Sequence, residues 1–279
     1  MPRMIAFQGE PGAYSHEACR NARPDYEALP CETFEDVITA VRSGAADLAM
    51  LPVENSTYGR VADIHRLLPE SGLHIVDEAF LRVRISLLGL KGTTLADIRE
   101  VRAHLVLLPQ SANFLRDHGI RGHAAADSAG AAAELAGGLR PAGEGVLASA
   151  LAGEIYGLDV LARDIEDHGH NTTRFVIMSR EIDLSRRGGD GMMTTFVFEV
   201  RNIPAALYKA MGGFATNGVN MTKLESYMID GSFTATRFYA DIEGHPEDAA
   251  VARALEELDY FTTNLDILGV YPADARRSL

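Results

Sequence analysis

Short apolar runs alternate with segments of helical period in the N-terminal part of the chain. Apolar runs lie at residues 4–7, 47–51, 103–107 and 145–148, and each is followed by a segment with apolar residues at helical spacing. A repeated order of strand and helix is typical of parallel strands joined by crossover helices. The pattern therefore predicts an α/β fold for this part.

The apolar periodicity stops at residues 183–191, which read Asp-Leu-Ser-Arg-Arg-Gly-Gly-Asp-Gly. Glycine and charge in such a stretch are typical of a linker. We therefore expect one domain over residues 1–182 and a second over residues 192–279.

The C-terminal part has a different order of elements. Residues 194–200 alternate like a strand, and Pro204 then opens a helix. The Asp230-Gly231 dipeptide suits a tight turn between two further strands. A second helix is expected from Pro246, and a last strand passes through residues 265–267. The predicted order is βαββαβ, a ferredoxin-like unit.

The composition is that of an ordinary globular protein, because 47% of the 279 residues are hydrophobic and 23% are charged. Lys and Arg total 26 against 39 for Asp and Glu, which gives a net charge of −13. This balance argues against general affinity for nucleic acid or anionic membranes. No run approaches the roughly 18 apolar residues of a membrane span.

The two cysteines, Cys19 and Cys31, lack the spacing of a zinc site. They are expected to be reduced thiols and to serve as small apolar residues. The apolar part of residues 1–9 is too short for a signal peptide, so a cytoplasmic location is expected.

Residues 9–16, Gly-Glu-Pro-Gly-Ala-Tyr-Ser-His, lie between a predicted strand and a predicted helix. Free backbone N–H groups at a helix N-terminus favour an anion, so this loop is a candidate carboxylate cradle. The alternative is an ordinary turn with Ser15 as the helix cap. The loop does not match phosphate-loop or dinucleotide glycine patterns.

Three other polar segments are candidates for ligand binding, because they lie at the end of a predicted strand or at the start of a predicted helix. Residues 51–59 leave an apolar strand, where ligands of open α/β sheets collect, and Glu54 is there either an acid or a partner of backbone N–H groups. Residues 127–132 and Pro109-Gln110-Ser111 both open helices, and capping alone explains them as well as ligand binding does.

Residues 167–175 lead into an apolar run. His168 and His170 lack the helical spacing of a paired metal site, so a metal is not expected. Adjacent hydroxyls followed by a guanidinium, Thr172-Thr173-Arg174, suit hydrogen bonds to an anion rich in oxygen. The alternative is a β-favouring threonine pair and a surface arginine.

Together these segments resemble the prephenate dehydratase family, enzymes that convert prephenate to phenylpyruvate. Matches in sequence order are far more specific than any one of them alone. The C-terminal unit looks like an ACT domain, an amino-acid-sensing module. The matching stretches are residues 7–15, 52–56, the small residues from 127, residues 148–149 with 156–158, and 172–175.

The resemblance implies a two-lobed catalytic domain like type II periplasmic binding proteins. Lobe one would comprise about residues 1–78 and 168–182, and lobe two about residues 79–167. The linker at 183–191 would lead to the ACT domain at 192–279. The resemblance also implies a homodimer or homotetramer, and no cofactor or metal.

The resemblance makes Thr173 the catalytic residue, which we interpret as a hydrogen-bond donor to the departing hydroxyl. Glu54 and His170 are candidate members of a proton relay. Arg174 and the helix N-termini at Ser15 and Ser128 are expected to grip the substrate's pyruvyl carboxylate. The expected substrate-binding residues are Ser15, Asn55, Ser56, Ser128, Thr172, Arg174 and Phe175, of which Phe175 is more suited to packing beneath the site.

Phenylalanine is the expected effector of the C-terminal unit. Tyr227-Met228 stand where family members commonly have Arg-Pro, and Ala205 replaces a usual glycine. Leu108 likewise stands where a histidine is frequent. The expected effector-binding residues are Ala205, Leu207, Asn220, Leu224, Glu225 and Ser226.

Three alternatives remain beside prephenate dehydration. The substrate could be arogenate, in which an amino group replaces the keto oxygen of the side chain. The chain could be a non-catalytic sensor, because both folds also occur in proteins that only bind ligands. A fusion to chorismate mutase is disfavoured, because residue 1 lies just before the first predicted strand.

Overall fold

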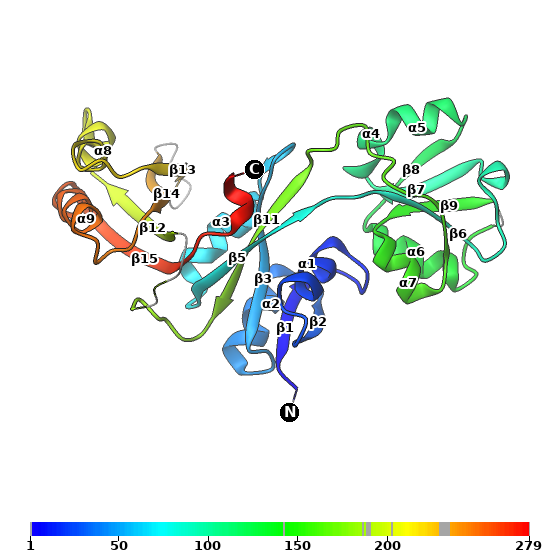
Figure 1. Ribbon diagram of the computed structural model, residues 1–279, viewed down its shortest axis with the longest axis horizontal. Helices are drawn as coiled ribbons and strands as arrows, with labels where there is room; N and C mark the ends of the chain where they lie inside the picture. Colours follow the sequence, from blue (N-terminus) through cyan, green and yellow to red (C-terminus); the bar gives the residue numbers. More distant parts are fainter. Residues whose placement is uncertain are drawn as a thin grey trace. The chain divides into compact units, whose positions relative to one another are not determined.

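In the computed structural model, contacts divide the chain into two compact units (Figure 1). Unit 1 comprises Met1–Gly59 and Phe80–Phe175, and unit 2 comprises Arg60–Ala79 and Val176–Leu279. The segment at residues 60–79, expected in lobe one, therefore packs with the C-terminal part. The residues described are 2–141, 143–185, 187, 191–201, 203–228 and 235–278, so the predicted Asp230-Gly231 turn and part of the predicted linker lie outside them.

The first sheet of unit 1 is parallel. The strand β1 (Met4–Gln8) pairs with β2 (Glu27–Cys31) and with β3 (Leu48–Asn55), and the crossover helices are α1 (Tyr14–Ala22) and α2 (Phe34–Ser43). The strand predicted at 47–51 is longer than expected and runs to Asn55. Its last residues are therefore paired strand residues rather than a loop beyond the strand.

The second sheet of unit 1 has the order β10-β6-β9-β7-β8. The strand β7 is parallel to β8 and β9, whereas β6 is antiparallel to β9 and β10, so the sheet is mixed. Leu87 and Leu88 belong to cores on opposite faces, as a sheet covered on both sides requires. The strands are β6 (Ser86–Gly89), β7 (Glu100–His104), β8 (Arg121–Ala125), β9 (Glu144–Ala148) and β10 (Asp159–Ala162).

The strand predicted at 103–107 was placed too late. It ends at His104, and Leu107 already begins a helix, because the buried Leu107 side chain packs into the core below β7. The helices around this sheet are α4 (Leu107–Gln110), α5 (Ala112–Asp117), α6 (Ser128–Ala136) and α7 (Ala150–Tyr156).

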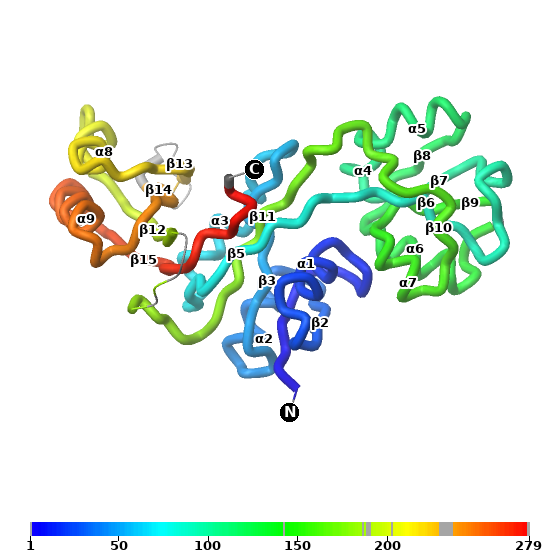
Figure 2. The backbone as a smooth tube through the Cα atoms, viewed as in Figure 1, coloured from blue at the N-terminus to red at the C-terminus, as the bar shows by residue number. Residues whose placement is uncertain are grey.

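Two extended segments of unit 1 join its two sheets and run side by side (Figure 2). The amide of Val83 donates to the Asn171 carbonyl at 2.9 Å, and the amide of Ile165 donates to the Ile85 carbonyl at 3.0 Å. The Glu166 carboxylate accepts a further bond from the Ile85 amide at 2.9 Å. The chain thus crosses between the sheets twice, along one hydrogen-bonded ribbon.

Unit 2 contains the predicted βαββαβ order. Its sheet has the antiparallel order β13-β14-β12-β15, and β5 (His74–Arg82) follows β15 through the pair Gly269–Ile75. Both helices begin later than predicted, because residues 204–205 and 246–248 form turns. The elements are β12 (Met192–Val200), α8 (Ala206–Thr216), β13 (Met221–Met228), β14 (Ala235–Glu243), α9 (Ala249–Phe261) and β15 (Thr262–Pro272).

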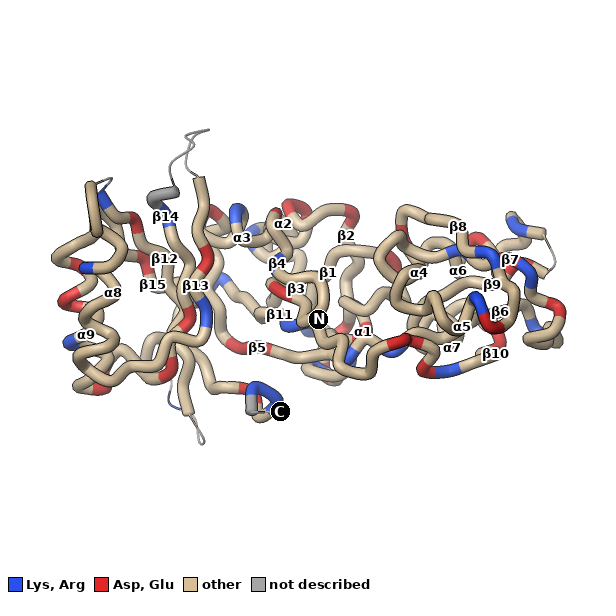
Figure 3. Tube along the Cα trace, turned by 90° about the horizontal axis from the view of Figure 1, so that it is seen from above, with Lys and Arg blue, Asp and Glu red and all other residues tan. Residues whose placement is uncertain are grey.

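The two faces of this sheet differ in chemistry. Phe196, Phe198 and Phe238 pack under α8 and α9 in an apolar core. The opposite face carries polar side chains that meet α3 (Ala62–Leu67) and the short helix η1 (Leu68–Glu70). Figure 3 shows acidic and basic positions interspersed in both units. None of the described helices is long and apolar enough to cross a membrane.

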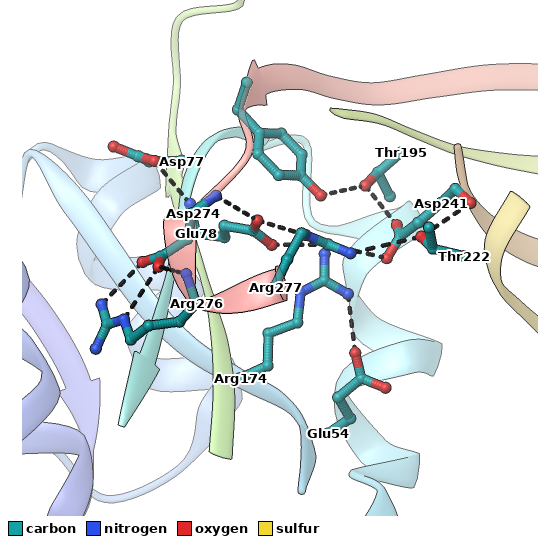
Figure 4. Close-up of polar contacts among 11 residues, drawn as sticks. Glu54, Asp77, Glu78, Arg174, Thr195, Thr222, Asp241, Asp274, Arg276 and Arg277 are labelled. Carbon is teal, nitrogen blue, oxygen red and sulfur yellow. Dashed lines mark hydrogen bonds and ion pairs between the residues drawn. The ribbon is translucent and has the colours of Figure 1, made fainter. Parts of the chain in front are cut away.

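A buried ion-pair network fastens the C-terminal turn η3 (Ala275–Ser278) to the polar face (Figure 4). The Arg277 guanidinium donates to both Glu78 oxygens, at 2.6 and 2.8 Å, and lies 3.8 Å from an Asp241 oxygen. The side chains of Glu78 and Asp241 are 0% exposed. Asp241 also accepts a bond from the Thr195 hydroxyl at 2.6 Å. One arginine thus neutralises two enclosed carboxylates.

We expect Arg277→Met to lower the free energy of unfolding by about 3–5 kcal/mol, because it removes the bidentate partner of the buried Glu78 carboxylate and a cation close to the buried Asp241 carboxylate. Denaturant unfolding of the full chain measures the effect. The matched control is Arg276→Met, since Arg276 is half exposed and pairs with nearby Asp274, and an exposed ion pair is worth about 0–1 kcal/mol. Equal losses in the two variants would contradict the assignment.

Candidate functional site

A chain of amide side chains joins the end of β3 to β11 (Thr172–Ser179) and to α4. The Asn55 amide nitrogen donates to the Asn171 oxygen at 2.6 Å and to the Thr173 hydroxyl oxygen at 3.0 Å. Asn171 is 3% exposed, and its own nitrogen donates to the Gln110 side-chain oxygen at 2.5 Å. These bonds hold Asn55, Asn171 and Thr173 in one arrangement.

The network determines what the Thr173 hydroxyl can do. Its oxygen accepts from Asn55, so the hydroxyl proton is left to donate elsewhere. The Asn55 oxygen is held in turn by the amides of Thr57 and Tyr58, at 2.9 and 3.0 Å. Thr173 is half-buried, so its hydroxyl is a fixed donor within reach of a ligand.

Ser56 and Thr172 are fastened to each other through their backbones. The Ser56 amide donates to the Thr172 carbonyl, and the Thr172 amide donates to the Ser56 hydroxyl oxygen, both at 2.9 Å. The Ser56 hydroxyl donates to the His170 carbonyl at 2.8 Å. The His170 ring is exposed and lies against His168, at a centroid distance of 5.6 Å. Ser56 is thus hydrogen-bonded to the first residue of β11 and to the residue two positions before it.

Glu54 and Arg174 lie on the opposite face of the sheet from Asn55 and Thr173, because successive strand residues point to opposite sides. They form an ion pair with a separation of 2.9 Å, and the Arg174 side chain is 3% exposed (Figure 4). The geometry gives no support to the expected carboxylate grip by Arg174, nor to a relay from Glu54 to Thr173. Phe175 is 1% exposed and belongs to the core.

The loop after β1 is clamped between α1 and α7. A Cβ at Gly12 would lie 2.7 Å from the Ala152 Cα, and Gly12 has a φ of +94°, so only glycine fits. The Ser149 hydroxyl donates to the Gly12 carbonyl at 2.6 Å and also caps α7. Glu10 lies against Gly130 in the first turn of α6. The loop that was expected to bind an anion therefore also carries a carboxylate.

His16 fastens the same loop from inside α1. The Gly12 amide donates to its Nδ1 at 3.0 Å, and the ring stacks on Phe7 at 5.1 Å. Burial lowers the pKa of His16, and Arg20 lowers it further. The ring is therefore held neutral, as an acceptor at Nδ1 must be.

Ser15 and Ser128 have roles that differ from the simplest capping model. Ala13, not Ser15, is the N-cap of α1, and Ser15 makes no side-chain hydrogen bond to another described residue. Asp127 caps α6, whereas the Ser128 hydroxyl accepts from the His104 amide at 2.9 Å. Neither serine is joined directly to Thr173 by a described hydrogen bond.

The two cysteines are free, and burial raises the pKa of both thiols. Neither is thus prepared as a nucleophile. Among the described residues, no group of three or more His, Cys, Asp or Glu is arranged to hold a metal ion.

The six expected effector residues of unit 2 do not share one surface. Leu224 and Ser226 point to one side of β13, and Glu225 points to the other, toward Arg60. Ala205 adopts a left-handed φ of 62° before α8, Leu207 packs on the core, and Asn220 is exposed.

Sequence reasoning missed Asn171 and undervalued Gln110. Asn171 precedes the Thr-Thr-Arg motif, and a polar residue that is buried at a strand entrance gives no periodicity signal. The Gln110 segment was noticed only as a helix start. A buried amide needs partners for both its oxygen and its nitrogen, and only the fold supplies them.

The chain thus combines a two-sheet α/β unit, which has a donor-rich network at its strand ends, with a ferredoxin-like βαββαβ unit. The family model of prephenate dehydratase matches residues 5–183, and the chain belongs to this family of hydro-lyases.

Curated relatives agree with this assignment. A bifunctional N-acyl-homoserine lactone acylase/prephenate dehydratase of Komagataeibacter europaeus is 54% identical over 99% of this chain and 98% of its own length. A chloroplastic arogenate dehydratase/prephenate dehydratase of Arabidopsis thaliana is 38% identical over 98% of this chain and 73% of its own.

Two solved structures are also similar. GqqA, described as a novel type of quorum quenching acylase, has a TM-score of 0.93 at 53% identity, with 99% of this chain and 100% of that one covered. Prephenate dehydratase of Arthrobacter aurescens in complex with L-Phe has a TM-score of 0.86 at 29% identity, with 97% and 90% covered.

We expect the His16 ring to titrate below the ordinary histidine pKa of about 6.5, as followed by NMR. Because the pKa is lower in the folded state, protonation favours unfolding. The stability that His16 contributes is present above the unfolded pKa and is lost as the pH falls through the folded pKa. His16→Gln identifies the resonance, and an ordinary or raised pKa would refute the loop assignment.

Proposed function

We propose that this chain catalyses the decarboxylating dehydration of prephenate to phenylpyruvate. Membership of the family supports the reaction class. The single observation that carries the proposal is the Thr173 hydroxyl, whose oxygen is occupied by Asn55 while its proton stays available.

The reaction needs little beyond positioned donors. The bond from the ring to its carboxylate breaks, and the electron pair enters the ring as CO2 departs. The ring hydroxyl leaves from the opposite end and takes up one proton as water. Aromatisation supplies the driving force, so the protein's task is to orient the dianion and to stabilise the leaving oxygen.

Thr173 donates its hydrogen bond to that leaving oxygen. A threonine hydroxyl is too weakly acidic to supply the proton by itself, so the proton reaches the oxygen from solvent or from a neighbouring group. With Glu54 committed to Arg174, His170 is the remaining relay candidate. Ser56, Thr172 and the backbone N–H groups at the starts of α1 and α6 would bind the pyruvyl side chain.

We expect Thr173→Val to lower kcat by about 10²–10⁴-fold, because it removes the donor to the leaving group and keeps the shape of the side chain. Thr173→Ser keeps the hydroxyl and should retain most of the activity. Phenylpyruvate formation from prephenate measures both. Equal turnover in wild type and Thr173→Val would remove Thr173 from the mechanism.

Arogenate is the nearest alternative substrate. A curated relative carries both activities in its name. In the proposed function the network around Thr173 would face the hydroxyl-bearing end of the ring, which the two substrates share. Purified protein given each substrate separately, with phenylpyruvate and phenylalanine quantified, discriminates between them. Binding of both without turnover would favour a sensor instead.

A second candidate activity is hydrolysis of N-acyl-homoserine lactones. The favouring observation is 54% identity to a bifunctional relative over nearly its whole length. Against it, burial raises the pKa of both thiols, so neither is prepared as a nucleophile. Release of homoserine lactone from an acylated substrate tests it, and Thr173→Val shows whether the two activities share a site.

We further propose that phenylalanine regulates the enzyme through unit 2, which has the ACT-like topology. A pocket of about 290 Å³ is lined in part by Ala206, the first residue of α8. The cations Arg201 and Lys209 suit a carboxylate there, and Tyr260 and Phe261 suit an aromatic side chain. A relative was crystallised with L-Phe.

Calorimetry with L-phenylalanine should show saturable binding, and Lys209→Ala should weaken it by about 5–20-fold, since one charge-assisted hydrogen bond is lost. Prephenate turnover should fall as the site fills. Absence of any binding heat across temperatures, with active enzyme, would rule this regulation out.

A further inference from the structure

The residue that follows the Asn55 turn is bound to the strand β13. One Arg60 guanidinium nitrogen donates to the Ser226 carbonyl at 3.2 Å and to the Glu225 carboxylate at 3.4 Å. Lys223 approaches the other Glu225 oxygen at 3.4 Å and is only 9% exposed. The Glu225 carboxylate is therefore oriented between two cations, and it is 28% exposed.

A second attachment lies five residues further on. His65 is 1% exposed, its Nδ1 is 3.2 Å from the Tyr227 hydroxyl, and its ring meets Tyr239 edge-on at 5.0 Å. Arg237 adds a contact of 3.7 Å to Glu70. The helix α3 and the turn after it are thus held on the polar face independently of Arg60.

The other end of the segment is the turn that orients Asn55. The amides of Thr57 and Tyr58 donate to the Asn55 side chain, and Gly59, with a φ of +79°, then begins the short strand β4 (Gly59–Arg60), which pairs with β3. A Cβ at Gly59 would meet nothing within 4 Å, so the glycine serves the backbone conformation alone. Arg60 is the first residue after this turn with a side-chain anchor.

We propose that Arg60 is a positioning residue for the candidate site. Its bonds to β13 hold the C-terminal end of the turn, so that the Thr57 and Tyr58 amides keep the Asn55 side chain aimed at Thr173. The kinetic part of this inference rests on the proposed function, whereas the effect on the turn does not.

Through Arg60, a change in β13 would also affect the turn that orients Asn55. The carbonyl of Ser226 and the carboxylate of Glu225 belong to a strand on which effector residues were expected, and a change in that strand alters the partners of Arg60. Loss of the Arg60 bonds should loosen the turn and leave unit 2 folded, because α3 keeps its buried His65 contacts.

The test compares Arg60→Gln, Arg60→Lys and the matched control Arg187→Gln in the full chain. Arg187 is 49% exposed and pairs with Glu247 and Asp248, so its loss removes a similar surface ion pair far along the chain. Amide hydrogen exchange at Thr57 and Tyr58 reports the turn directly, and steady-state kinetics with prephenate separate kcat from KM.

In Arg60→Gln we expect exchange at these two amides to rise about 5–10-fold, the equivalent of one hydrogen bond. We expect kcat to fall about 3–10-fold with a smaller change in KM, because misplaced donors act chiefly in the transition state. Arg60→Lys should recover most of both, and Arg187→Gln should change neither.

Unchanged exchange at Thr57 and Tyr58 in Arg60→Gln would overturn the inference, whatever reaction the protein catalyses. A loosened turn with wild-type kcat would overturn it as well, because the turn would then not position the site. If the wild-type protein fails to convert prephenate while Arg60→Gln loosens the turn, the proposed function fails and the structural part of the inference stands.

Discussion

The alternation of side chains along the paired ends of β3 and β11 is the constraint on which the site depends. Consecutive residues of a strand point to opposite faces, so Asn55 meets Thr173 on one face and Glu54 meets Arg174 on the other. The amide network and the ion pair are thereby kept apart. The Thr173 hydroxyl therefore has the uncharged Asn55 amide, and neither member of the ion pair, as its neighbour.

The choice of amides rather than charged groups around Thr173 has a physical consequence. A carboxylate there would attract the hydroxyl proton and would also repel a dianionic substrate. Asn171 instead donates to the Gln110 side-chain oxygen and accepts from the Asn55 nitrogen, and Asn171 is almost fully buried. The site therefore keeps its shape with little net charge, while Arg174 and Glu54 neutralise each other on the far face.

In unit 2, too, polar and charged side chains are paired with one another on one face of the sheet. Arg277 pairs with Glu78 and lies close to Asp241, and the Tyr227 hydroxyl lies within hydrogen-bond distance of the His65 ring. The ferredoxin-like order was predictable because each helix there has one apolar stripe. The packing of residues 60–79 on this face was not predictable, because the hydrophobic periodicity of a segment does not identify the strand against which it packs.

The Gly9–His16 loop and the Thr172–Phe175 motif could be found from the sequence, because turn chemistry and adjacent hydroxyls are local properties. The ion pair of Arg174 with Glu54 was not predictable, since a motif read along the chain does not state which face each residue takes until the partner strand is known. Helix starts moved by two or three residues for a similar local reason, as Ala205 shows with its left-handed backbone.

By itself, then, the amino-acid order determined the alternation of strands and helices, the βαββαβ order of the C-terminal part and the motifs of the family, because these follow from near neighbours. Only the tertiary structure decided that Asn171 and Gln110 complete the site, that Arg60 is anchored on β13 and that Arg277 neutralises buried acids. Those choices depend on groups far apart in the chain, whose hydrogen bonds form only when folding removes the water between them.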